Sequence, residues 1–352
     1  MFSAGLCVIF NNMKERQTSI SDIAHACGVS AMTVSRALRQ RSNVHPETLA
    51  KILAKAEELG YFKSSRLGRP HRQSKDTPHR ISLVLGGVGS TVSIFHSRLV
   101  NTIQRTLIRH NCECVIYSND GSYPGFLILL AALKRQKSDA VLIIGDFPES
   151  QLKTLLMNFP GAILLDNPGV DNFDATFSSF NFDNASGTEA MLKHLISRGR
   201  KRIVLLSGVK EHFFSRIMEN SYRKVLSEAG INIDERMILH ADFTSPGAAE
   251  VMTEFIRKDI AFDAVFSNDE MALGVYRVLQ SNRITIGEDV AVAGCDDLPL
   301  GQMLYPALST VSLDYGKLAG AAVEFILDQE SFTPRRELIA PELIIRESTG
   351  KL

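Results

Sequence analysis

Apolar residues between positions 18 and 61 recur every three or four residues in three short segments. This spacing places them on one face of an α-helix in each segment. The apolar stripes run through Ile20–Cys27, Val34–Leu38 and Leu49–Leu59. Gly28 has the backbone freedom to end the first helix, Ser30 can cap the second, and Pro46 suits the first position of the third. Three short helices with a tight turn between the first two predict a helix-turn-helix.

After Arg80 the pattern changes to short apolar runs that alternate with segments of helical spacing. The runs read ISLVL, AVLII, AILL, RIVLL, DAVF and VAVA. Uninterrupted runs of this length are typical of buried parallel strands whose two faces are covered by helices. About 270 residues of this kind predict an α/β body of two doubly wound parallel-sheet subdomains, with ligand chemistry at the carboxyl ends of the strands.

Composition and charge support this division of the chain. The 352 residues are 45% hydrophobic and 22% charged, which is typical of a globular protein with two or three folding units. The net charge is zero, but residues 13–80 carry 13 Lys and Arg against 6 Asp and Glu, and the remainder carries 26 against 33. A basic head on an acidic body is typical of a DNA-binding head, whose cations displace counterions from phosphates. A solvated charged face is the alternative.

Cysteine usage and the first residues bear on the location of the protein. Five cysteines without zinc-finger spacing indicate a reducing cytosol and no metal site. The opening MFSAGLCVIF is apolar, but it lacks a basic start and is too short for a membrane span. We therefore expect residues 1–17 to be an N-terminal extension, with Met13 as an alternative start, and the protein to be cytoplasmic, associated with the nucleoid when DNA-bound, and without a cofactor.

The second predicted helix has the composition of a DNA-reading helix. Its outward side and exposed N-terminal end carry Ala31, Met32, Ser35 and Arg36. In a docked helix-turn-helix this end enters the major groove, where arginine can form two hydrogen bonds with guanine. We expect Ser30, Thr33 and Ser35 to contact phosphates. A three-helix protein-interaction module is the alternative.

The segment from Thr18 to Tyr61 closely resembles the DNA-binding head of the lactose-repressor (LacI/GalR) family of bacterial transcriptional regulators. The family pattern D-V-A-x-x-A-G-V-S-x-x-T-V-S-R-x-L reads here from Asp22 to Leu38 with conservative changes. The resemblance implies that Ala31 and Met32 occupy two variable base-reading positions and that Arg36 makes the general base contact. It extends over nearly the whole chain, and implies a homodimer on a palindromic operator and a body of the type I periplasmic-binding-protein-like fold.

The predicted domains follow from these patterns and from the resemblance. Residues 18–62 are expected to form the helix-turn-helix domain, 63–79 a basic linker, and 80–352 the effector-binding and dimerisation domain. Its first subdomain should comprise 80–181 and 315–330, and its second 182–314 and 331–352, with crossovers near Phe182 and Tyr315.

The linker departs from the family pattern. The usual hinge-helix pattern is absent, and Pro70 stands where the family places the leucine that enters the minor groove. We expect Lys63, Arg66 and Arg69 to contact DNA. They would do so either in an A·T-rich minor groove or as part of a flexible basic tether.

The resemblance also implies an effector site between the subdomains, with ligand residues at strand ends. The candidates are Ser90, Phe95, Asp166, Phe182, Arg216, Asn268 and Asp296. Carboxylates and amides can bind the vicinal hydroxyls of a sugar, and an aromatic ring can stack on its apolar face. The alternatives are that the polar residues cap helices and that Phe95 and Phe182 pack in the core.

Two positions depart from the family pattern of this site. Met218 stands where the family supplies an arginine to the effector, and Leu313 stands where many relatives have glutamine. Arg216 lies two residues before Met218, on a different helical face. Loss of a bidentate cation disfavours an effector that carries a carboxylate or a phosphate, so we expect a sugar or a sugar derivative.

These features predict a transcriptional regulator, most simply a repressor under effector control. The alternatives are a small-molecule binding protein without a regulatory role and a regulator controlled by a protein partner. We do not expect an enzyme, because the sequence has no G-x-S-x-G, H-E-x-x-H or Walker A pattern. His194 and Asp183 are available, but His194 lies at an ordinary helix-strand junction.

Overall fold

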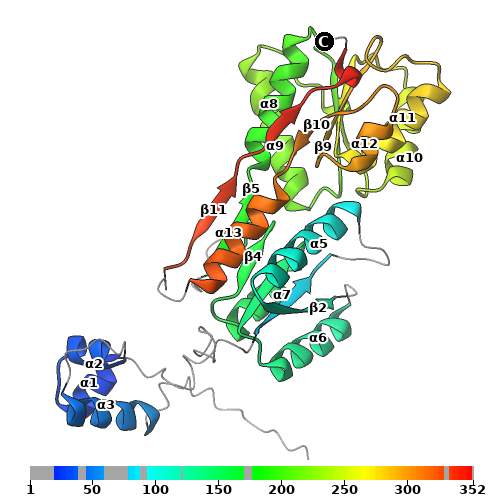
Figure 1. Ribbon diagram of the computed structural model, residues 1–352. Coiled ribbons are helices and arrows are strands. Elements are labelled where there is room, and N and C mark those ends of the chain that lie inside the picture. The colour runs from blue at the N-terminus through cyan, green and yellow to red at the C-terminus, as the bar shows by residue number, and fades with distance from the viewer. Residues whose placement is uncertain are drawn as a thin grey trace, which may run out of the picture. The chain divides into compact units, whose positions relative to one another are not determined.

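The computed structural model of the chain describes residues 20–38, 45–58, 78–87, 93–119, 122–169, 177–328 and 333–350. The chain divides into two compact units, Met1–Arg69 and Pro70–Leu352 (Figure 1). The predicted N-terminal extension and most of the predicted linker lie outside the described residues.

The first unit contains the three predicted helices. They are α1 (Ile20–Cys27), α2 (Ala31–Leu38) and α3 (Pro46–Glu58). Their shared core contains Ile23, Ala24, Cys27, Val34, Ala37, Ile52 and Ala56. Gly28 has a φ of 69°, a conformation in which glycine is free of side-chain strain, and it ends α1 as predicted. Ser30 Oγ accepts a hydrogen bond from the Thr33 amide at 3.1 Å, so the predicted cap of α2 is confirmed.

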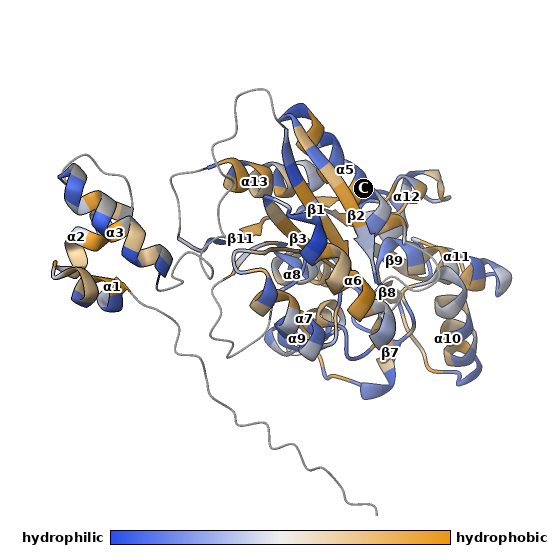
Figure 2. Ribbon diagram, turned by 90° about the horizontal axis from the view of Figure 1, so that it is seen from below, coloured by the Kyte–Doolittle hydropathy of each residue, from blue (hydrophilic) through white to orange (hydrophobic). Residues whose placement is uncertain are grey.

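The first sheet of the second unit has the strand order β11-β5-β4-β3-β1-β2, and every neighbouring pair is parallel. Its strands are β1 (His79–Leu85), β2 (Cys112–Ser118), β3 (Ala140–Ile144), β4 (Ile163–Leu165), β5 (Ser178–Phe182) and β11 (Arg336–Ile339). The helices that belong with them are α5 (Ile94–Arg109), α6 (Tyr123–Gln136), α7 (Glu149–Asn158) and α13 (Tyr315–Leu327) (Figures 1 and 2). We call this half the first subdomain.

The second sheet has the order β12-β10-β9-β8-β6-β7 and is parallel except for β12, which pairs antiparallel with β10. Its strands are β6 (Ile203–Ser207), β7 (Ile238–His240), β8 (Ala264–Phe266), β9 (Ala291–Cys295), β10 (Ser309–Ser312) and β12 (Glu342–Ile344). The helical elements are α8 (Asn184–Ser197), α9 (Phe213–Glu228), α10 (Ser245–Arg257), α11 (Asp269–Ser281), α12 (Pro299–Met303) and the 3₁₀ turns η1 (Glu235–Met237) and η2 (Glu347–Thr349). We call this half the second subdomain.

One part of the predicted subdomain division is wrong. Residues 331–352 were assigned to the second subdomain, but β11 pairs with β5 of the first sheet before β12 joins the second sheet. The chain therefore crosses between the subdomains three times, the third time at Ala340–Pro341. The short strand β11, with only Ile339 fully buried, has no continuous apolar run that would have marked it as a strand.

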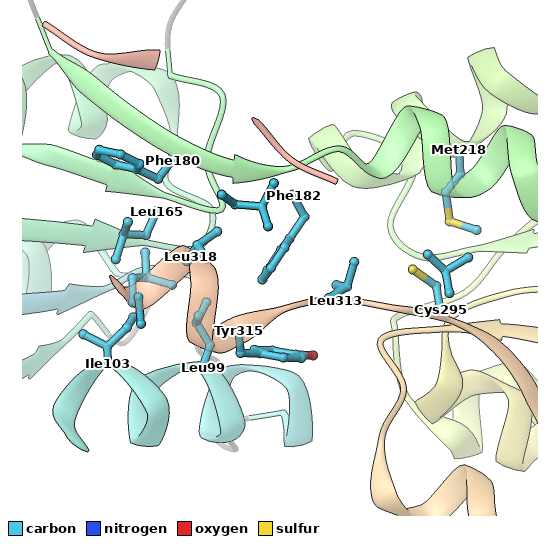
Figure 3. Close-up of a cluster of buried hydrophobic side chains, with 14 of the residues drawn as sticks. Leu99, Ile103, Leu165, Phe180, Phe182, Met218, Cys295, Leu313, Tyr315 and Leu318 are labelled. Carbon is cyan, nitrogen blue, oxygen red and sulfur yellow. The ribbon is translucent and has the colours of Figure 1, made fainter. Parts of the chain in front are cut away.

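A continuous apolar core extends from one subdomain into the other. It contains Leu99 and Ile103 of α5 as well as Met218 of α9, and the crossover segment contributes Leu313 and Tyr315. Figure 3 shows Phe182 and Leu313 between the residues of the first subdomain and the pair Met218 and Cys295. The crossovers are thus packed segments of a core that the two subdomains share.

Candidate functional site

The N-terminal end of α2 presents small and apolar side chains to solvent. Ala31 is exposed, and Met32 has 64% of its surface exposed although it is a large apolar residue. Ser35 is half-buried, and the Ser30 and Thr33 hydroxyls lie 2.8 Å apart within the cap. The opposite side of α2 is buried through Val34 and Ala37. The helix therefore has one face that stabilises the head and another that is open to a partner.

The structure does not describe the side chains of several residues that the sequence predicts to contact DNA. Arg36 lies on α2, but its side chain is not among those described, and Lys63, Arg66 and Arg69 lie outside the described residues. The same holds for Ser90 of the predicted effector site. Their roles remain predictions from the sequence.

Asp166 lies directly after β4, at the edge of the first sheet that faces the second subdomain. Its residue surface is 8% exposed, and its φ of 48° is in the left-handed region. Burial raises the pKa of its carboxyl to about 7, an effect that a hydrogen bond with the Asn184 side chain partly opposes. Asn184 begins α8 just after the crossover, and it too is buried. Within the described residues, a carboxyl with no hydrogen bond to a cationic side chain thus lies at the predicted site.

Asp296 occupies the corresponding position after β9 in the second sheet. It is 5% exposed and has a φ of 112°, a conformation that only glycine adopts without strain. Burial raises the pKa of its carboxyl well above the usual range, and the neighbouring carboxylates of Asp269 and Asp166 raise it further. The Asp166 carboxylate is one of the groups that raise the pKa of Asp296, and Tyr315, whose ring packs on Phe182, donates a hydrogen bond to the Asp296 carbonyl, so the strand ends of the two subdomains lie near each other.

The adjacent residues Asn268 and Asp269 have structural partners. Asn268 Oδ1 accepts a hydrogen bond from the Met271 amide at 3.0 Å and caps α11, so any ligand contact from this side chain would use its amide nitrogen. Asp269 accepts hydrogen bonds from the Leu298 amide and the Thr310 hydroxyl, both at 2.6 Å. Asp269, which the sequence did not single out as a site residue, therefore joins α11 to the loops around β9 and β10.

Three aromatic rings lie together beside these carboxyls. The ring centroid of Phe95 is 6.4 Å from that of Phe182 and 5.7 Å from that of Tyr315, and the Phe182 and Tyr315 centroids are 5.4 Å apart. Phe182 and Tyr315 are buried, and Phe95 is half-buried. The predicted pair Phe95 and Phe182 is thus brought together by the structure, and Tyr315 completes the group.

Arg98 connects the two subdomains, which the sequence reasoning missed. From α5 of the first subdomain its Nη1 donates hydrogen bonds to the carbonyl oxygens of Asp296, at 3.3 Å, and Asp297. Its guanidinium lies 4.4 Å from the centre of the Tyr315 ring, and the Tyr315 hydroxyl donates to the same Asp296 carbonyl at 3.2 Å. A second inter-subdomain contact joins the Ile94 amide to Glu270 Oε2 at 3.4 Å. The strand-end carboxyls are therefore enclosed by contacts that cross from one subdomain to the other.

Arg216 and Met218 lie on different faces of α9, as predicted. Met218 is fully buried in the common core, whereas Arg216 is exposed and donates to the Glu211 carbonyl at 2.7 Å. Arg216 opposes the rise that burial causes in the pKa of Asp146, so it lies near the end of β3 in the first subdomain. Burial, together with the nearby Arg216 guanidinium, lowers the pKa of His212 to about 4. Arg216 is thus close to the subdomain junction, without a hydrogen bond to Asp166 or Asp296.

A groove of about 390 Å³ lies at the crossovers. It is lined by Arg98, Thr102, residues 312–317, Ala340 and Glu342. None of the predicted effector residues that the structure describes lines it. The buried carboxyls and the open groove are separate features that share Arg98 and Tyr315.

Two family models match the chain. Bacterial regulatory proteins, lacI family, matches residues 19–64, and the periplasmic binding protein-like domain matches residues 192–349. Among curated proteins, the chain is 24% identical over 336 residues to the ribose operon repressor of Escherichia coli K12, covering 94% of this chain and 99% of that protein.

Solved structures share the fold. The transcriptional regulator CelR in complex with cellobiose superposes with a TM-score of 0.69 at 23% identity, covering 94% of this chain and 99% of that one. The Lac repressor dimer bound to operator and the anti-inducer ONPF gives a TM-score of 0.68 at 22% identity, covering 96% and 100%. Within the described residues, no helix is long and apolar enough to cross a membrane.

Proposed function

Because the chain belongs to the lacI family of bacterial regulatory proteins, we propose that it is a sequence-specific transcriptional repressor that binds a palindromic operator as a homodimer. A small effector, a sugar or sugar derivative, would change its affinity for the operator from a site between the two subdomains. The protein would act in the cytoplasm, without enzymatic activity and without a cofactor.

The observation that carries this proposal is the two-sided helix α2. Val34 and Ala37 fix it in the core of the head, while Ala31 and Met32 at its N-terminal end are left exposed. This is the arrangement in which a helix-turn-helix places side chains against base edges in the major groove. Ala31 and Met32 present apolar surface that suits thymine methyl groups, and Arg36, one turn further along α2, would supply the contact to guanine.

Support for an effector comes from the body and from the relatives. Asp166 and Asp296 follow strands of the two sheets and Asp166 contributes to the raised pKa of Asp296, so both lie at the strand ends, which is where doubly wound folds bind ligands. The names of the relatives refer to ribose and cellobiose, which makes a sugar-like effector the simplest expectation. An effector can change DNA binding only by binding two arrangements of the subdomains unequally. The hydrogen bonds of Arg98 across the junction stabilise one such arrangement.

Support for a dimer comes from exposed apolar side chains. Met303, the last residue of α12, is 80% exposed, and Tyr305, two residues further along the chain, is 89% exposed. Large apolar side chains grouped on a surface indicate an interface with another molecule. A second copy of the chain is the expected partner, because a two-fold dimer matches a palindromic operator.

The test measures operator discrimination by the full-length protein. Its operator would be selected from random double-stranded DNA, and binding to this operator and to a scrambled duplex would be compared by fluorescence anisotropy. Arg36→Ala should reduce the ratio of the two affinities by about 5- to 150-fold, the range of one lost bidentate base contact. Lys63→Ala should weaken both affinities equally and flatten the dependence on salt by about one counterion. Equal losses on both duplexes for Arg36→Ala would contradict its role as a base reader.

A further inference from the structure

Three buried side chains with acceptor oxygens converge between the subdomains. Asp166 comes from the end of β4, Asn184 from the first turn of α8, and Asp296 from the end of β9, and each is more than nine-tenths buried. Two further acids, Asp269 and Glu270, contribute to the raised pKa of Asp296. Both subdomains therefore supply negative charge or acceptor oxygens to one small region.

One acceptor in this region lacks a hydrogen-bond partner. The Asn184 side chain is hydrogen-bonded to the Asp166 carboxyl, and among the described residues nothing donates to Asn184 Oδ1. Buried polar atoms without partners are uncommon in folded proteins, and a ligand that donates hydrogen bonds would satisfy them.

The basic groups of this region are engaged elsewhere. Arg98 donates to main-chain carbonyls, Arg346 Nη2 pairs with Asp297 Oδ1 at 2.8 Å, and Arg216 donates to the Glu211 carbonyl. Burial lowers the pKa of His96 and of His212 to about 4, so both imidazoles are neutral at pH 7. In the described part of the chain, no Lys or Arg side chain is hydrogen-bonded to the Asp166 or Asp296 carboxyl.

The remaining surroundings are apolar and aromatic. The rings of Phe95, Phe182 and Tyr315 lie together. Leu313 lies beside Phe182, and Met218 is buried further toward the second subdomain (Figure 3). Aromatic rings attract cations through the negative charge of their faces, and together with carboxylates they form common binding sites for ammonium groups. An anion at the carboxyl oxygens would meet acceptors and aromatic rings, because the Arg98 guanidinium is engaged by the main-chain carbonyls of Asp296 and Asp297 and by the Tyr315 ring.

We propose that the effector carries an ammonium group on a compact and partly apolar frame, such as an amino sugar, and that Asp166 and Asp296 bind this group beside Phe95 and Phe182. This inference rests on the proposed function, in which the region between the subdomains is the effector site. The ammonium ion would neutralise the carboxyls and donate to Asn184 Oδ1, and the frame would pack against the aromatic rings.

The experiment uses matched ligands that differ in charge at one group. Thermal shift and calorimetry on the full-length protein would compare D-glucosamine, D-glucose and D-glucuronate, the three galactose counterparts, and cyclohexylamine, cyclohexanol and cyclohexanecarboxylate. In each set the amine should bind most tightly and the anion should not bind. Asp296→Asn should weaken the best amine by at least about 30-fold, because a buried charge pair loses one partner. Met218→Lys should weaken binding of the same amine to a similar extent, because it places a second ammonium group in the site. Met218→Leu is the matched control and should bind the amine as tightly as the parent protein does.

Each outcome decides the proposal. An alcohol or anion that binds as tightly as its amine, unchanged amine affinity in Asp296→Asn, or the absence of binding by every amine would overturn it. Operator affinity would be measured in the same samples. If a neutral or anionic ligand changes operator affinity, the ammonium proposal fails but the proposed function stands. If the parent protein binds operator and scrambled DNA equally, the proposed function itself fails.

Discussion

Replacing Asp166 by asparagine should stabilise the folded protein at pH 8 and change its stability much less at pH 5. The Asp166 carboxyl is buried after β4, and its resolved interaction partner is the Asn184 amide. An ionised carboxylate in such a place loses hydration without gaining a cation, which disfavours the folded state. Asparagine has nearly the same shape, never ionises, and tolerates the left-handed φ of 48° at this position.

The size of the effect follows from the pKa of Asp166. Burial raises it from 3.8 to about 7 in the folded protein, so the folded state holds a proton between these values that the unfolded chain has lost. Stability must therefore fall as the pH rises through this window, and the full cost is present above the folded pKa. At 1.36 kcal/mol per pKa unit, the part of this cost that develops between pH 5 and pH 8 is about 2–3 kcal/mol. The Asp166→Asn variant should lack this part of the pH dependence.

Urea unfolding of the parent and the variant at pH 5, 6, 7 and 8, followed by circular dichroism, measures this difference. The other titrating groups occur in both proteins and cancel. Asp269→Asn is the matched control, since burial raises the pKa of Asp269 to about 7 as well, but its carboxyl accepts from the Leu298 amide and the Thr310 hydroxyl. This control should lose about 1–3 kcal/mol, because asparagine cannot accept both hydrogen bonds with the same carboxylate oxygens. An Asp166→Asn variant with the pH profile of the parent would refute the view that Asp166 is buried without a compensating cation.

Two further predictions concern packing and assembly. Gly274→Ala should lower the free energy of unfolding by about 1–3 kcal/mol in urea unfolding, because the new methyl group would overlap a main-chain oxygen at the start of α10. Gly320→Ala is the control, because no atom lies within 4 Å of its new methyl group. This variant should gain about 0.5–1 kcal/mol from helix propensity. Met303→Glu places a charge on the exposed apolar surface at α12, so this variant should be a monomer when its mass is measured by light scattering at micromolar concentration. Met157→Glu, at another exposed methionine, is the control and should remain a dimer. A dimeric Met303→Glu protein would move the interface elsewhere.

The parts of the fold that the sequence predicted are those set by local patterns. The three helices of the head, the Gly28 turn and the Ser30 cap were predicted because each depends on residues within one or two turns of the chain. The buried strands were recognisable as apolar runs for the same reason. Strand β11 was misassigned because its pairing with β5 depends on residues about 157 positions away, and its own sequence, Arg336–Ile339, has only one buried residue and no apolar run.

The candidate site could be predicted only in part, because a polar residue after a strand has two physical uses that look alike in sequence. It can cap the following helix or remain available to a ligand, and Asn268 and Asp269 turn out to have their oxygens engaged within the protein. Arg98 was missed because nothing in its own segment reveals that its guanidinium reaches the carbonyl groups of Asp296 and Asp297 in the other subdomain.

The backbone adds a reason to assign ligand chemistry to Asp296. Its φ of 112° is a conformation in which any side chain is strained, at a cost on the order of 1–3 kcal/mol that glycine would avoid. The carboxyl recovers little of this cost, since burial and the neighbouring carboxylates of Asp269 and Asp166 all disfavour its ionised form. Asp297, by contrast, has a φ of 47° and a carboxylate that pairs with Arg346. Of two adjacent aspartates in unusual conformations, one is thus explained by an ion pair within the protein. Asp296 has no ion pair with a described residue, and a bound cationic group would supply one.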